Sequence, residues 1–408
     1  FNDLLTINGA TTLSGASLNA NVTLAGTNVL TLEGETDATG IDFTGTGRVQ
    51  LNDGAILTGG QFLNSPANAS SEELIIAERG NVTLSGVTLG TTSAIQLSQS
   101  SIIVDGSLSV ASGATITVEP TSSSSITGSA PATPITGAAS DAPFTMVFTV
   151  ASISVTLSNL DFDANATVNF NGANVEDSVI RPAVTFGTDA SGIFTDVTFE
   201  GAVNVLTGGV NASSERLTFN GLVTVEAATT LSGASFGADV EVDGVKLTLE
   251  GETDATGIDF TGTGQVQLND GAILTGGQFL NSPSDSADEL IINEVANVTL
   301  SGVTLGTTSA IQLSQSGIVI DGSLSVVSGA TIQVNATNSS SIEGAVANTP
   351  VTGASSGAPF DFTVEGSTTA SDLTISNLEF SDNATVDFDG ATVEDSVLNS
   401  AYTLDDEG

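Results

Sequence analysis

One long segment occurs twice in this 408-residue chain, and this tandem repeat constrains the fold more than any other feature. Residues 31–66 recur as 248–283 with a single change, from Arg48 to Gln265, and residues 81–100 recur unchanged as 297–316. A chain that repeats itself end to end is usually built by stacking similar units, each of which contacts mainly its neighbours. The repeat therefore predicts a solenoid whose function resides in an extended surface.

The repeat divides the chain into two copies, which we predict at residues 1–212 and 213–408. The second copy is shorter at its end: it lacks residues that would correspond to the last part of the first copy. Solenoids normally carry polar capping units, and neither end of this sequence has one. We therefore expect either a window of a longer protein or a subunit whose ends meet other copies.

The charge of the chain is strongly negative, with 47 acidic and 5 basic residues and a formal net charge of -42. Phosphate groups would be repelled, so nucleic acid is not expected as a partner, and an anionic membrane surface is equally disfavoured. We see no segment long and apolar enough to insert into a membrane. Hydrophobic residues still make up 39% of the chain, which is enough for a continuous core.

Short apolar runs with a two-residue period recur along both copies and are followed by Gly, Asn, Asp or Ser. Examples are Val22-Thr23-Leu24, Leu30-Thr31-Leu32 and Val82-Thr83-Leu84. This period is typical of strands with one buried face, and no sustained helical stripe is present. We predict an all-β, right-handed parallel β-helix with about 20 residues per turn. A string of immunoglobulin-like sandwiches is the alternative all-β fold.

A second pattern, apolar-x-Gly/Asn-x-x-apolar, marks the expected corners between strands. It occurs at residues 13–18, 57–62, 84–89, 157–162 and 375–380. Glycine and asparagine can adopt a left-handed backbone conformation at low cost, which suits a sharp bend. The Ser/Thr-rich stretches at 120–134 and 336–350 break the rhythm, and we expect a loop or looser coil there, most simply a surface insertion.

The chain resembles the repetitive β-helical shafts of secreted microbial surface proteins, such as filamentous-haemagglutinin-like adhesins, autotransporter passengers and cell-surface filaments. The resemblance depends on the phrase Thr-Leu-Ser-Gly-Val-Thr-Leu-Gly at 83–90 and 299–306, the Ser/Thr/Asn/Gly-rich turns, the absence of Cys and the acidic balance. It implies an extracellular or cell-surface location and a structural or adhesive role. No Gly-Gly-x-Gly-x-Asp run occurs, so a dedicated calcium-binding nonapeptide solenoid is not indicated.

The chain lacks residue types that many catalytic mechanisms require, because it has no His, no Cys and only one lysine, Lys246. This excludes Ser-His-Asp and Cys-His catalysis and His-ligated zinc. Parallel β-helices also include polysaccharide-cleaving enzymes, and two carboxylates suffice for glycoside hydrolysis. We expect no enzyme, because a tandem copy of an entire catalytic coil set would be unusual.

Acidic residues shared by the two copies are the candidate metal ligands, and calcium, which prefers oxygen ligands, is the possible cofactor. In the densest cluster the first three carboxylates alternate and would share one face of a strand. The alternative is a solvated acidic surface. The candidates are Glu33, Glu35, Asp37 and Asp42 in the first copy, and Glu250, Glu252, Asp254 and Asp259 in the second.

Nine Asn-x-Ser/Thr sequons are possible glycosylation sites if the source modifies its surface proteins. Because Asn and Thr are abundant, several are also expected by chance. The sequons begin at Asn21, Asn68, Asn81, Asn165, Asn211, Asn297, Asn335, Asn338 and Asn383.

Together these features predict a structural subunit or shaft of an extracellular filament, sheath, surface layer or adhesin. We expect the main partner to be the protein itself, in a head-to-tail homopolymer, because a non-closing heterologous contact generates a fibre. Divalent cations and glycans are further possible partners. A glycan-binding adhesive shaft is the first alternative, although the chain has no Trp to stack on sugars. Thr-bearing faces leave ice binding as another alternative.

Overall fold

The computed structural model describes residues 1–408 except 66–72, 91–93, 150–154, 188–191, 207–208, 212, 283–288, 307–309, 367–372, 389, 400 and 404–408. Within these described residues the secondary structure consists of β-strands and turns, without a helix. Contacts between Cα atoms divide the chain into two compact units, Phe1–Gly201 (unit 1) and Ala202–Gly408 (unit 2). The predicted boundary between the sequence copies, at residues 212 and 213, is a property of the repeat and stays a prediction.

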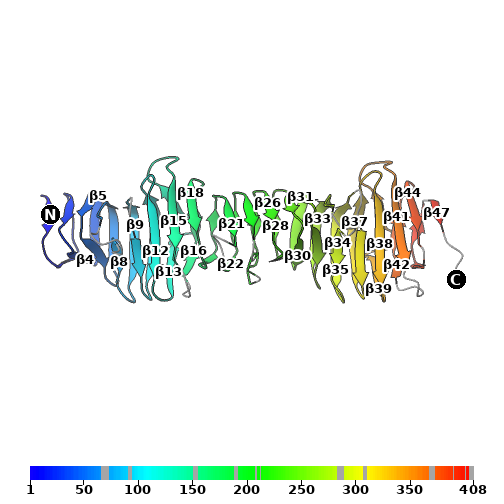
Figure 1. Ribbon diagram of the computed structural model, residues 1–408, viewed down its shortest axis with the longest axis horizontal. Coiled ribbons are helices and arrows are strands. Elements are labelled where there is room, and N and C mark those ends of the chain that lie inside the picture. The colour runs from blue at the N-terminus through cyan, green and yellow to red at the C-terminus, as the bar shows by residue number, and fades with distance from the viewer. Residues whose placement is uncertain are drawn as a thin grey trace. The chain divides into compact units, whose positions relative to one another are not determined.

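One face of unit 1 is an eight-stranded sheet in which neighbouring strands come from successive turns of the chain (Figure 1). All of its described strand pairs are parallel. Its strands are β2 (Thr11–Ser14), β4 (Val29–Glu33), β6 (Arg48–Leu51), β8 (Leu74–Ile76), β10 (Ala94–Leu97), β12 (Thr115–Pro120), β15 (Phe144–Phe148) and β18 (Ala166–Asn169).

The remaining strands of unit 1 form its other faces, and several of the longer ones bend in the middle, so that one strand serves two faces. They are β1 (Leu5–Ile7), β3 (Val22–Leu24), β5 (Glu35–Gly45), β7 (Ile56–Phe62), β9 (Asn81–Leu89), β11 (Ser101–Val110), β13 (Ser124–Gly128), β14 (Thr133–Gly137), β16 (Val155–Ser158), β17 (Leu160–Phe162), β19 (Asn174–Glu176), β20 (Val179–Ile180), β21 (Val184–Phe186), β22 (Phe194–Thr195) and β23 (Thr198–Phe199).

Unit 2 repeats this plan with a nine-stranded sheet made of β27 (Thr229–Ser232), β30 (Lys246–Glu250), β32 (Gln265–Leu268), β34 (Leu290–Ile292), β36 (Ala310–Ser314), β38 (Thr331–Thr337), β41 (Phe360–Gly366), β44 (Ala384–Asp387) and β47 (Ala401–Thr403). Its other faces hold β24 (Val203–Val205), β25 (Thr218–Phe219), β26 (Val223–Val225), β28 (Ser235–Phe236), β29 (Val240–Val242), β31 (Glu252–Gly262), β33 (Ile273–Phe279), β35 (Asn297–Leu305), β37 (Gly317–Val326), β39 (Ser340–Gly344), β40 (Thr349–Gly353), β42 (Leu373–Ser376), β43 (Leu378–Phe380), β45 (Thr392–Glu394) and β46 (Val397–Leu398).

Each unit is therefore a parallel β-solenoid with stacked coils about 21 residues apart, and the predicted fold class is confirmed. The register shows how the coils stack, since Leu30 and Leu32 of β4 pair with Val49 and Leu51 of β6. Immunoglobulin-like sandwiches require antiparallel strands. That alternative is wrong for the described residues, whose strand pairs are all parallel.

The core of each unit is a column of apolar side chains that point inward at every second residue. In β4 the buried residues Leu30 and Leu32 alternate with half-exposed neighbours, as the two-residue period of a strand requires. Aromatic rings continue the column from coil to coil. Phe43 stacks on Phe62 with ring centroids 5.0 Å apart, in register across β5 and β7. The interior is thus closed turn by turn by in-register contacts.

The corners predicted from the apolar-x-Gly/Asn-x-x-apolar pattern adopt the left-handed conformation. Gly15, Gly59 and Gly86 have φ angles of 61°, 68° and 62°, while Asn159 and Asn377 have 57° and 58°. The five sequence phrases therefore mark five real bends. At Gly59 and Gly86 the bend lies within one continuous strand, whereas Asn159 and Asn377 each separate two short strands.

The Ser/Thr-rich stretches are not surface insertions. Residues 120–134 contain the whole of β13 and the beginning of β14, and residues 336–350 contain β39 and the beginning of β40. Ile126 and Ile342 are buried, with 1% and 2% of their surface exposed, so each stretch contributes to the core. The prediction of a loop failed because Ser and Thr are compatible with both sides of these strands: Ser125 and Thr127 lie at half-exposed positions, whereas Ser124 and Thr133 are buried.

Candidate functional site

The predicted acidic cluster of unit 1 is divided between faces of the solenoid. Glu33 ends β4, whereas Glu35 and Asp37 lie in β5, beyond a bend at Gly34 with a φ angle of 62°. Asp42 lies further along β5, after a shift in register between residues 38 and 42. The alternating carboxylates therefore do not share one strand, as their spacing had suggested.

Each of these carboxylates has a local role in unit 1, apart from the exposed Glu35. Glu33 Oε1 accepts a hydrogen bond from Asn52 Nδ2 at 2.7 Å, and Asp42 Oδ2 accepts one from Asn21 Nδ2 at 3.1 Å. Asp37 Oδ1 accepts the backbone N–H of Thr39 at 3.0 Å. This backbone hydrogen bond and a second from the Thr39 side chain lower the pKa of Asp37, because they stabilise the ionised carboxylate.

In unit 2, Glu250 and Asp254 repeat the arrangements of Glu33 and Asp37, whereas Asp259 differs from Asp42 because Asp239 replaces Asn21. Glu250 Oε1 accepts from Asn269 Nδ2, and Asp254 Oδ1 accepts from the backbone N–H and the hydroxyl of Thr256 at 3.0 and 2.7 Å. The backbone N–H of Asp259 donates to Asp239 Oδ1 at 3.0 Å, and Glu252 is exposed. Within the part of the chain that the structure describes, no group of three or more acidic side chains is placed to hold a metal ion. Calcium binding stays a prediction.

A short hydrogen-bonded row of polar side chains joins neighbouring coils on each large sheet. In unit 1, Gln50 Nε2 donates to Asn52 Oδ1 at 2.8 Å, and Asn52 then donates to Glu33. In unit 2, Lys246 Nζ donates to Gln267 Oε1 at 2.9 Å, and Gln267 Nε2 donates to Asn269 Oδ1 at 2.9 Å. The row orients amide and carboxylate groups on adjacent coils, so each large sheet carries one small group of preorganised polar side chains.

The sequons lie on the surface of the described part of the chain. The exposed asparagines are Asn21, Asn81, Asn165, Asn297 and Asn338, whereas Asn211, Asn335 and Asn383 are half-buried. Several of these side chains are engaged, as when Asn81 Oδ1 accepts from Ser101 Oγ at 2.6 Å and Asn383 Nδ2 donates to the carbonyl of Ala358 at 3.0 Å. Asn68 lies outside the described residues. Modification stays a prediction.

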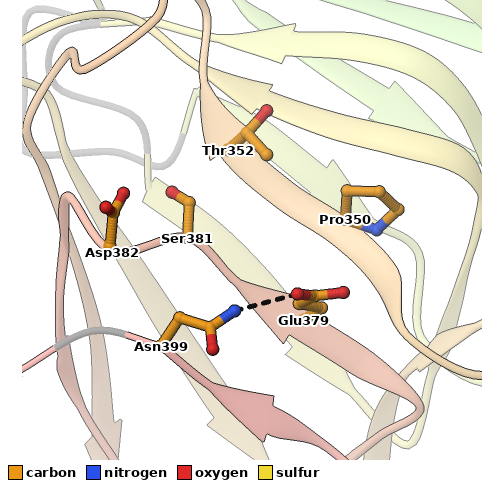
Figure 2. A pocket seen from close by; sticks show the side chains of 6 residues that line it. All are labelled: Pro350, Thr352, Glu379, Ser381, Asp382 and Asn399. Carbon is orange, nitrogen blue, oxygen red and sulfur yellow. Dashed lines mark hydrogen bonds between the residues drawn. The ribbon is translucent and has the colours of Figure 1, made fainter.

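A hollow of about 550 Å³ lies on the outer surface of unit 2, over β40 and β43 (Figure 2). It is lined by Pro350, Thr352, Glu379, Ser381, Asp382 and Asn399. Asn399 Nδ2 donates to Glu379 Oε1 at 2.8 Å, as the dashed line in Figure 2 shows. Its lining residues carry two carboxylates, two hydroxyls and one amide, beside a proline ring.

Sequence reasoning did not single out this hollow, although the two copies differ there. The first copy has Asp161, Asp163, Ala164 and Arg181 where the second has Glu379, Ser381, Asp382 and Asn399. Four substitutions at one place in otherwise similar copies could have directed attention to it. They did not, because the prediction concentrated on residues that the copies share.

Comparisons with known proteins give no relative for this chain. No family model, no curated protein and no solved structure matches it. In the described residues, no helix is long and apolar enough to cross a membrane.

Proposed function

We propose that this chain is a structural subunit or shaft of an extracellular filament, sheath, surface layer or adhesin. One observation carries the proposal: within each unit, parallel strands from successive coils pair without interruption over an eight- or nine-stranded sheet. Catalysis is not part of the proposal.

The physical support comes from how such a stack resists deformation. Successive coils are joined by rows of backbone hydrogen bonds and by in-register apolar layers such as the Phe43–Phe62 stack. Each coil therefore stabilises the next, and the stability of a solenoid grows with the number of neighbouring contacts. The acidic surface adds repulsion between molecules and favours solubility. These properties suit a load-bearing or spacing element.

Self-assembly is the finer part of the proposal. The backbone pairing that joins one coil to the next can also join coils of two molecules, and a head-to-tail contact that does not close gives a filament. Sedimentation velocity over a range of protein concentrations, with and without calcium, tests this directly. Growing assemblies that electron microscopy resolves as filaments would support it, whereas a single monomeric species under all conditions would contradict it.

A glycan-binding adhesive shaft is the second candidate, and the polar rows on the large sheets favour it. Glu33, Asn52 and Gln50 hold one another in fixed orientations, and unit 2 has the corresponding row through Lys246. Such preorganised amide and carboxylate groups are suited to sugar hydroxyls. A glycan array probed with the intact chain tests this candidate. Binding that is lost in an Asn52→Ala, Asn269→Ala double variant would support it, and an array without any bound glycan would contradict it.

A further inference from the structure

The hollow in unit 2 lies at a fixed place in the stack of coils. Pro350 of β40 pairs in register with Glu379 of β43, which pairs with Val397 of β46. Two residues further along these strands, the backbone N–H of Ser381 donates to Val351 O, and that of Asn399 donates to Phe380 O, both at 3.1 Å. The lining side chains thus come from three successive coils.

The corresponding place in unit 1 is occupied by a guanidinium group of the chain itself. Pro134 pairs with Asp161, which pairs with Val179, so the register is the same as in unit 2. Arg181 Nε and Nη2 donate to Asp161 Oδ1 and Oδ2 at 2.7 and 2.8 Å. Hydrogen bonding and charge attraction from Asp161 raise the pKa of Arg181, and Glu200 and Asp163 add to the attraction. This surface of the solenoid is therefore able to hold a guanidinium.

Unit 2 keeps the carboxylate that pairs with the guanidinium, as Glu379 in place of Asp161, and lacks the cation, while Ser381 replaces Asp163. Asn399 stands where Arg181 stands, and its neutral amide makes one hydrogen bond to Glu379 in place of the two-pronged ion pair. Asp382 replaces Ala164, so the hollow has two carboxylates among its lining residues and no basic side chain. Figure 2 shows Asn399 beside Glu379, while Thr352, Ser381 and Asp382 surround the rest of the hollow.

We propose that this hollow binds an arginine side chain of a second polypeptide, whose guanidinium takes the place that Arg181 takes in unit 1. A planar guanidinium matches a carboxylate with two parallel hydrogen bonds, which a lysine ammonium does not do. The Pro350 ring offers an apolar surface for the methylene groups of the arginine stem. Unit 2 would thus bind a guanidinium from a partner, whereas in unit 1 the corresponding guanidinium belongs to Arg181 of the chain itself. This goes beyond the proposed structural role and does not depend on self-assembly.

Titration of the intact chain with the peptide acetyl-Gly-Arg-Gly-amide tests the proposal, with binding followed by broadening of the peptide's NMR signals. The matched peptides carry citrulline, a neutral isostere of arginine, or lysine. The salt concentration should be about 0.15 M, where the Debye length is about 8 Å and the general attraction of an acidic protein is screened. We expect the arginine peptide to bind at one site on each chain. We expect the citrulline peptide to bind at least about tenfold more weakly. Equal affinity for arginine and citrulline would overturn the proposal.

Two variants place the site on the molecule. Asn399→Arg supplies an internal guanidinium and should abolish binding of the arginine peptide. Arg181→Asn removes the internal guanidinium of unit 1 and should raise the number of sites from one to two. Circular dichroism confirms that each variant is folded, and Glu379→Gln, which keeps the shape of the side chain, provides a second test by loss of affinity. Unchanged binding in Asn399→Arg or Glu379→Gln would refute the assignment, while the sedimentation test of the proposed function would be unaffected.

Discussion

A single methyl group added at Gly45 tests whether the close stacking of backbones holds these coils together. Gly45 ends β5 with a φ angle of 95°, and a Cβ atom built there would lie 2.2 Å from the carbonyl oxygen of Leu24 on the neighbouring coil. That oxygen accepts hydrogen bonds from the N–H groups of Thr46 and Gly47 at 2.8 and 3.1 Å. The carbonyl therefore cannot move away from an alanine without losing both bonds.

The expected loss of stability for Gly45→Ala is the sum of three contributions. A left-handed conformation costs an alanine roughly 1–2 kcal/mol, and the lower entropy of the unfolded chain returns roughly 0.4–1 kcal/mol. Displacing the carbonyl of Leu24 adds about 1 kcal/mol for each lost hydrogen bond. We expect Gly45→Ala to lower the free energy of unfolding by about 3 kcal/mol.

Gly40 provides the matched control in the same strand. Its φ angle is 73°, and a Cβ atom built there would meet nothing within 4 Å. Gly40→Ala therefore carries the conformational cost alone, about 1 kcal/mol or less after the unfolded-state gain. Unit 2 repeats the pair, since a Cβ atom at Gly262 would lie 2.3 Å from Val242 O and one at Gly257 would meet nothing within 4 Å.

Urea denaturation followed by circular dichroism measures the free energies, and amide hydrogen exchange shows where the stack opens. Exchange is needed because a solenoid can open locally without global unfolding. We expect faster exchange at the β3–β5 pairing in Gly45→Ala and little change in Gly40→Ala. Equal destabilisation by the two variants would refute the reasoning, since only the steric contact distinguishes them.

Three further measurements test the core, the acidic groups and the net charge. Phe62→Ala removes one ring of a buried stacked pair and should cost about 3–5 kcal/mol in urea denaturation, whereas Phe62→Leu should cost clearly less. Hydrogen bonds from Thr39 lower the pKa of Asp37 in the folded state, so the ionised carboxylate stabilises the fold at pH values above its ordinary pKa of 3.8. This stabilisation is lost as the pH falls through the lower folded-state pKa, and Asp37→Asn should flatten that part of a stability–pH profile. Raising NaCl from about 0.01 to about 0.15 M shortens the Debye length from ~30 to ~8 Å and should raise the melting temperature, because a net charge of -42 repels itself; an unchanged melting temperature would contradict this.

The strands of this fold could be predicted from sequence because burial alternates with a strict two-residue period. In Leu30-Thr31-Leu32 the leucines are fully buried and the threonine is not, as the pattern predicts. The bends could be predicted for a related reason, since Gly and Asn tolerate a left-handed backbone. Both features are local, and each is determined by a few consecutive residues.

The acidic cluster shows where local reasoning stops. Glu33, Glu35 and Asp37 alternate as in a strand, and nothing in this spacing reveals that Gly34 turns the chain between the first two. The turn is supported from the neighbouring coil, where the N–H of Gly15 donates to the carbonyl of Glu33 at 3.0 Å. At Gly34 the bend is thus accompanied by a contact one turn away in the sequence, which the spacing of the carboxylates does not show.

The polar surface of this chain contains pairs of side chains that lie one turn of the solenoid apart. Asn52 meets Glu33 across 19 residues, Arg181 meets Asp161 across 20, and Asn399 meets Glu379 across 20. A two-residue or three-residue motif search cannot find such pairs, whereas a search at the spacing of one coil does. Because the coils of the two copies are otherwise so alike, a change at one member of such a pair alters the surface without disturbing the core. The exchange of Arg181 for Asn399 is such a change, and the proposal that unit 2 binds an arginine of a second polypeptide depends on it.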